Sequence, residues 1–105
     1  MQGALDWFKV TLLFPLRDNK GNPFDKSVWD WQTNEITRLL RGFTDRGVVE
    51  GYWQGQTESN RSIVVIVKTE DEIAVIRNFL REARIKFGQR VMYLDYHPVH
   101  YEEVT

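Results

Sequence analysis

The segment Ser62–Val67, SIVVIV in one-letter code, decides the fold. Five of its six residues are apolar and β-branched, which favours a strand. An apolar run without polar alternation is typical of a central strand. Directly after it, Glu70–Glu72 put negative charge in the first turn of a helix, and Arg84 and Lys86 put positive charge in its last turn, as the helix dipole favours. The stretch therefore predicts a central strand followed by a helix that ends near Gly88.

The preceding residues predict a strand, a helix and a second strand. Apolar residues alternate from Phe8 to Leu16, the period of a strand with one buried face. A turn-rich loop follows, and Ser27 three residues before Asp30 resembles a capping box that starts a helix, although Asp25 could cap the helix instead. Residues 48–54 predict the next strand, which its glycine suits to a sheet edge. Residues 55–60 are expected to form the hairpin loop after it, and residues 91–96 a fourth strand.

This order, βαββαβ, predicts one fold class. The split βαβ arrangement closes into a ferredoxin-like α+β sandwich, a four-stranded antiparallel sheet with both helices on one face. A chain of 105 residues is near the commonest size of a single domain, so we expect one domain over residues 1–105.

Composition excludes several function classes. A net charge of -1 and a pI near 6.1 argue against nucleic acid as a partner, and residues 62–67 display no aromatic side chain for base stacking. No nucleotide-phosphate motif is present, His97 and His100 lack the partners of a metal shell, and we expect no cofactor. The chain has no cysteine and Met1–Asp6 lacks signal-peptide features, so we expect a cytoplasmic protein that does not enter a membrane.

Helices on one side leave the other face of the sheet open. If the even-numbered residues of the first strand lie under the helices, Lys9, Thr11 and Leu13 point outward. The two-sided run at 62–67 then adds either its odd-numbered or its even-numbered apolar residues to that face. Such a patch predicts a homo-oligomer interface, for which we expect a dimer. The alternatives are a small-molecule pocket or a face covered by the C-terminal segment.

Further candidate site residues lie around this face and on the helices. The residues Tyr93, Asp95 and His97 share strand parity and could border the open face. The last two also suggest an acid/base pair, against the simpler interpretation of a structural histidine. On the first helix, Trp31 points away from the stripe that contains Trp29 and Ile36, so we expect it exposed, as an interface anchor or packed against a loop.

The second helix carries a basic stripe. Arg77, Arg81 and Arg84 follow i, i+4, i+7 spacing and could grip an anion. Stripes of this kind are usually solvated helix faces, so both interpretations stay open.

Several short motifs resemble a known family. They are the Arg17–Gly21 loop, Trp29, Gly51–Trp53, Lys86–Gln89, and Leu94-Asp95 with Pro98-Val99. Together they resemble a bacterial domain-of-unknown-function family (number three-five-seven-four) over most of the chain. The resemblance implies the ferredoxin-like fold and implies no activity, so no catalytic residue follows from it.

We therefore expect a small binding or interaction module rather than an enzyme, one that self-associates through the open sheet face or through Trp31. The alternative is a dimeric α+β-barrel-type enzyme, or a small-ligand-binding protein, with a pocket for an aromatic or quinone-like compound near Tyr93, Asp95 and His97. A third candidate is an anion-binding regulatory domain that uses the basic stripe.

Overall fold

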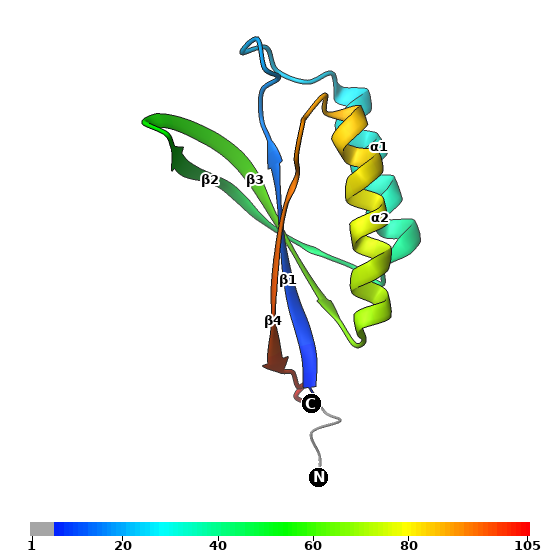
Figure 1. The fold of residues 1–105 in the computed structure, drawn as a ribbon. Coiled ribbons are helices and arrows are strands. Elements are labelled where there is room, and N and C mark those ends of the chain that lie inside the picture. Colours follow the sequence, from blue (N-terminus) through cyan, green and yellow to red (C-terminus); the bar gives the residue numbers. More distant parts are fainter. Residues whose placement is uncertain (1–5) are drawn as a thin grey trace.

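The computed structural model describes residues 6–105 and confirms the expected element order. The elements are β1 (Asp6–Pro15), α1 (Lys26–Leu39), β2 (Thr44–Trp53), β3 (Gln56–Val67), α2 (Glu70–Lys86) and β4 (Tyr93–His100). The four strands form one antiparallel sheet in the order β2-β3-β1-β4, and both helices cover the same face of it (Figure 1). This is the ferredoxin-like α+β arrangement. The expectation about a signal peptide concerns Met1–Asp6, of which Met1–Leu5 lie outside the described residues.

The core lies between the helices and the helix-facing side of the sheet. Val10, Leu12 and Phe14 of β1 are fully buried, and the odd-numbered apolar residues of β3 are buried beside them. Each buried apolar side chain of this size stabilises the fold by roughly 1.5–3 kcal/mol relative to exposure. The helices contribute Ile36 from α1 and, from α2, the residues Ile73, Ile76, Phe79, Leu80 and Ala83. The odd-numbered apolar residues of β3 therefore face the helices, a choice that the sequence left open, and Val64 and Ile66 belong to the open face.

The two helices begin differently. Thr69 caps α2, because its side-chain oxygen accepts a hydrogen bond from the Glu72 backbone N–H at 3.3 Å. The predicted capping box of α1 is wrong. The helix begins at Lys26. The Asp30 carboxylate, which the capping box would need, instead forms an ion pair with the Lys26 ammonium, with the two groups 2.9 Å apart.

The β2–β3 hairpin projects away from the helices as a two-stranded arm (Figure 1). The hairpin turns at Gln54 and Gly55, which both have positive φ, the combination of a tight two-residue turn. Tyr52 and Trp53, beside the turn, are 76% and 67% exposed. The radius of gyration of 14.9 Å exceeds the roughly 13 Å of a compact chain of about 100 residues, in keeping with a protruding arm.

Candidate functional site

The open sheet face brings the strand candidates together. Lys9 lies opposite both Ile66 and His97, and the next outward residues of β1 follow the same register. We call this surface the open face. Its central side chains are Lys9, Thr11, Leu13, Ser62, Val64, Ile66, Tyr93, Asp95 and His97.

One hydrogen bond on the open face joins two of the predicted site residues, Tyr93 and Asp95. The Tyr93 hydroxyl donates to Asp95 Oδ2 at 2.5 Å, and this bond raises the pKa of Tyr93, because the neutral phenol is the form that donates. Within residues 6–105, no hydrogen bond joins Asp95 to His97. The geometry therefore pairs Asp95 with a phenol, and the acid/base role of His97 stays a prediction.

Charge is distributed unevenly along the open face. Lys9 and His97 lie toward the end at which β3 runs into α2, and the Lys68 ammonium lies there too, 5.8 Å over the ring of Trp7. Glu58 lies at the opposite end, on the arm, paired with Gly51 of β2. The open face thus carries Lys9 and Lys68 at one end, the basic end, where Glu103 also lies through its bond to Tyr101, Asp95 at its centre and Glu58 at the other end.

The C-terminal segment covers part of the basic end. The Tyr101 ring packs on Trp7 with ring centroids 5.0 Å apart. Val64 is 8% exposed, whereas Tyr93 is 48% exposed, so the centre of the face is shielded by its neighbours and the β4 side is open. The alternative that the chain's own C-terminal segment covers the open face therefore holds at the end of that face where Trp7 lies.

Trp31 is not exposed in the way we expected. Its ring stacks on Phe79 of α2 with centroids 5.5 Å apart and an interplanar angle of 18°, and the Lys86 ammonium lies 5.6 Å over the ring. The buried stripe of α1 is centred on Gln32 and Ile36, not on Trp29. Trp31, about 100° from Gln32 on the helix, therefore lies on the flank that meets α2. Its role as an interface anchor stays a prediction.

The basic stripe of α2 lies on an exposed surface with local partners. Arg77 donates to the Tyr96 hydroxyl at 3.3 Å, Arg81 donates to Asn78 at 2.6 Å, and Arg84 reaches a backbone carbonyl of the following loop at 3.5 Å. These contacts turn the three guanidiniums to different neighbours. A shared anion site for them stays a prediction.

A pocket that the sequence did not reveal lies between α1 and the start of the β2–β3 pair. Its volume is about 330 Å³. Its walls include Trp29, Gln32, Thr33, Phe43, Asp45 and Arg61. We call it the α1 pocket. A smaller hollow of about 180 Å³ lies between the two helices. Neither of these two hollows is lined by Tyr93, Asp95 or His97.

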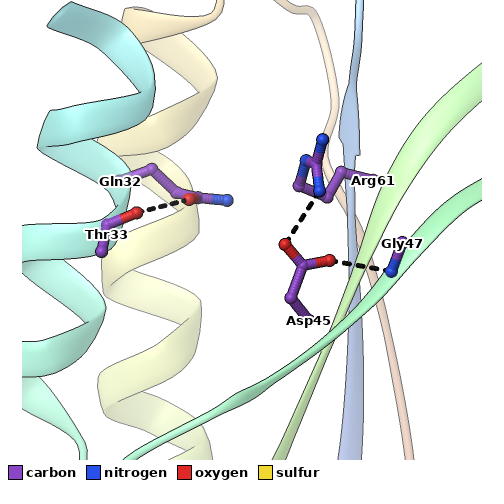
Figure 2. Close-up of polar contacts among 5 residues, drawn as sticks. All are labelled: Gln32, Thr33, Asp45, Gly47 and Arg61. Atoms are coloured by element: carbon purple, nitrogen blue, oxygen red, sulfur yellow. Dashed lines mark hydrogen bonds and ion pairs between the residues drawn. The ribbon is translucent and has the colours of Figure 1, made fainter. Parts of the chain in front are cut away.

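The polar groups of the α1 pocket come from three elements. Arg61 of β3 forms an ion pair with Asp45 of β2, with Nη1 and Oδ2 2.8 Å apart, and the other Asp45 oxygen accepts from the Gly47 N–H at 2.8 Å (Figure 2). Gly47, with a φ of +82°, lies in the β-bulge that separates Asp45 from the regular ladder. The Arg61 guanidinium also lies 5.7 Å over the ring of Trp29. The bulge and the ion pair thus hold a charged pair at one wall.

Gln32 forms the opposite wall. It is 3% exposed, its Oε1 accepts from the Thr33 hydroxyl at 3.4 Å, and its Nε2 is buried without a hydrogen-bond partner within residues 6–105. Figure 2 shows this amide nitrogen directed away from α1, toward the side on which Arg61 and Asp45 lie. A glutamine between Trp29 and Ile36 on the buried stripe was the one signal in the sequence that could have pointed to the pocket.

Two further observations limit the kind of site. Among residues 6–105, no group of three or more His, Asp or Glu side chains is placed to hold a metal ion. In the same part of the chain, neither helix has the length and apolar content to cross a membrane.

The fold and its open face define a class, the ferredoxin-like α+β proteins, and two solved structures share this arrangement. One is a phage SAM lyase in complex with S-methyl-5'-thioadenosine, with a TM-score of 0.55 and 17% sequence identity over 94% of this chain and 93% of that chain. The other is phage SAM lyase in the apo state, with a TM-score of 0.52 and 14% identity over 95% and 92% of the two chains. At these identities the likeness concerns the fold alone.

No protein-family model and no curated protein sequence matches the chain. The resemblance to the domain-of-unknown-function family therefore stays a prediction.

Proposed function

We propose that this protein is a small cytoplasmic binding module that pairs with a second copy of itself through the open face. The observation that carries the proposal is the charge separation along this face, with Lys9 and Lys68 at one end and Glu58 at the other. Electrostatically complementary surfaces favour association and fix its register.

A two-fold axis would bring the two ends together. Glu58 and Ile66 are eight residues apart on β3, a span of about 26 Å in a strand. A two-fold axis that runs parallel to the sheet above the open face, and crosses β3 at Ser62 midway between them, places the arm of one copy over the basic end of the other. Glu58 of each copy then faces Lys9 and Lys68 of the partner, so one pair of contacts forms twice.

Apolar side chains on the same face supply area for such an interface. Val49 is 38% exposed, Trp53 67% and Tyr93 48%, and all three share the outward side of the sheet with Leu13. A standard interface buries about 800 Å² on each partner, and an aromatic side chain buries about 150–250 Å². Trp53 and Tyr93 together thus expose roughly a third of what a stable dimer needs.

A charge-exchange experiment tests the dimer. Lys9→Glu and Glu58→Lys are each expected to shift the mass measured by light scattering toward the monomer, because each places like charges opposite one another. The double variant restores the opposite charges and is expected to recover the dimer. Lys20→Glu, in the exposed loop after β1, is the matched control. A wild-type protein that remains monomeric at high concentration, or a double variant no better than the single ones, would refute the proposal.

Small-ligand binding is a second candidate function, and the α1 pocket favours it. A phage SAM lyase of the same fold was solved with S-methyl-5'-thioadenosine, which supports the idea that this scaffold can hold a small molecule. The α1 pocket lies at Gln32 and Arg61, and a pocket near Tyr93, Asp95 and His97 stays a prediction.

Thermal unfolding of the intact protein with increasing S-methyl-5'-thioadenosine tests whether this chain binds that nucleoside. Binding to the folded state raises Tm in proportion to the logarithm of ligand concentration. A constant Tm up to millimolar nucleoside would remove that compound as a ligand.

A further inference from the structure

The α1 pocket contains a buried donor that the fold leaves unused. Gln32 is 3% exposed, and its Nε2 has no partner within residues 6–105. Buried polar groups in native proteins are nearly always hydrogen-bonded, so an exception calls for an explanation. Because this nitrogen is directed away from α1 toward the side of Arg61 and Asp45, a molecule in the pocket is placed to accept from it (Figure 2).

The opposite wall also has an excess of donors. A guanidinium has five N–H groups, and Asp45 accepts one of those of Arg61 at 2.8 Å. Both oxygens of Asp45 already accept, one from Arg61 and one from the Gly47 N–H. The pocket therefore offers N–H donors at both ends, and its only carboxylate is already neutralised. A ligand that satisfies it must carry an acceptor at each end.

Aromatic and aliphatic side chains lie between the two polar walls. Trp29 and Phe43 are partly buried aromatic walls, and Ile63 is buried at the floor. A volume of about 330 Å³ is at the lower end of the roughly 300–1,000 Å³ typical of small-molecule sites. These dimensions suit a compound with one or two fused planar rings.

We propose that the α1 pocket binds a small planar aromatic compound with a hydrogen-bond acceptor at each end, one acceptor taking the Gln32 Nε2–H and the other an Arg61 N–H. The proposal rests on the small-ligand function above and names its ligand class. It does not depend on self-association, because the pocket residues lie on the helix side of the sheet, away from Lys9 and Glu58.

Isonicotinate is the first probe, because it carries a ring nitrogen and a carboxylate at opposite ends of one ring. Benzoate is its matched partner without the ring nitrogen, and duroquinone is an uncharged compound with two opposed carbonyl groups. Titration followed by amide NMR is expected to move one side-chain NH₂ proton of Gln32 downfield with isonicotinate and duroquinone, as a new hydrogen bond does, and to show no such downfield shift with benzoate.

Gln32→Met is the decisive variant, because methionine fills a similar volume without a donor. It is expected to weaken the binding of isonicotinate about tenfold, the effect of losing one hydrogen bond between uncharged groups. The affinity for benzoate is expected to stay unchanged. Asn34→Met, on the exposed side of α1, is the control and is expected to bind all three compounds as the wild type does. Should Gln32→Met not fold, the NH₂ resonances of the wild-type protein decide the question alone.

Two results would overturn the proposal. One is an isonicotinate affinity that Gln32→Met leaves unchanged. The other is the absence of any Gln32 resonance shift at millimolar isonicotinate and duroquinone. If the nucleoside of the preceding subsection raises Tm while these probes do nothing, the ligand class is wrong and the small-ligand function stands.

Discussion

Replacing Gln32 by methionine is expected to make the unliganded protein more stable, an unusual result for a buried position. A buried donor without a partner costs about 1–3 kcal/mol, and the substitution removes that cost. It also removes the Thr33–Gln32 hydrogen bond, which at 3.4 Å is long and contributes at most about 0.5 kcal/mol. Methionine adapts to irregular space and keeps the packing against Ile36.

The openness of the pocket beside Gln32 favours a cost of about 1.5 kcal/mol, in the lower half of that range, so the balance is a gain of about 1 kcal/mol in the free energy of unfolding. For a domain of this size, such a change raises Tm by about 4–8 °C. Urea denaturation followed by circular dichroism measures it. Gln56→Met, at an exposed glutamine on β3, is the control and should change stability by less than about 0.5 kcal/mol.

A destabilised Gln32→Met variant would refute the reasoning. It would mean that the amide stabilises the native structure and that its nitrogen is satisfied in solution. The pocket would then be a packing feature of α1 and not a site kept for a ligand.

Three further predictions concern other parts of the fold. Trp31→Ala is expected to lower the free energy of unfolding by about 2 kcal/mol in urea denaturation, because Phe79 of α2 loses the half-buried ring that stacks on it. The light-scattering mass is expected to stay unchanged, and a shift from dimer to monomer would instead identify Trp31 as an interface anchor. Thr69→Ala is expected to cost about 1 kcal/mol in the same assay through loss of the α2 cap, whereas Thr69→Ser should cost little. Asp95→Asn is expected to lower the pKa of Tyr93 toward the ordinary phenol value of 10.0, measured by ring NMR signals across an alkaline titration. Because the folded-state pKa of Tyr93 is raised, this bond stabilises the protein below the ordinary phenol pKa, and its contribution is lost as the pH rises through the raised value. An unchanged Tyr93 titration in Asp95→Asn would contradict the assigned cause.

Much of the architecture followed from local patterns in the chain. The alternation from Phe8 to Leu16 and the run Ser62–Val67 each indicated a strand, and charge at both ends of 70–86 indicated a helix. These signals are local, because strand and helix periods depend on neighbouring residues only. The βαββαβ order, the position of β2 at a sheet edge and the gathering of Leu13 and Tyr93 on one face all follow from them.

Element boundaries depended on pairing across the sheet. The β2 strand begins at Thr44 rather than Val48, because a bulge lets Asp45 pair with Ile63 before the ladder resumes. Residues 56–60, expected as a loop, are strand, since the tight turn at Gln54 and Gly55 places them opposite β2. A ladder partner of a polar residue cannot be read from its own neighbours.

The α1 pocket was decided by tertiary structure alone. Gln32, Asp45 and Arg61 come from three elements, and no spacing along the chain relates them. Likewise, packing against α2 rotated α1 so that Gln32 rather than Trp29 lies at the centre of its buried stripe. Periodicity determines that a helix has a buried side, but the contacts of the assembled fold determine which residues occupy it and which donor is left without a partner.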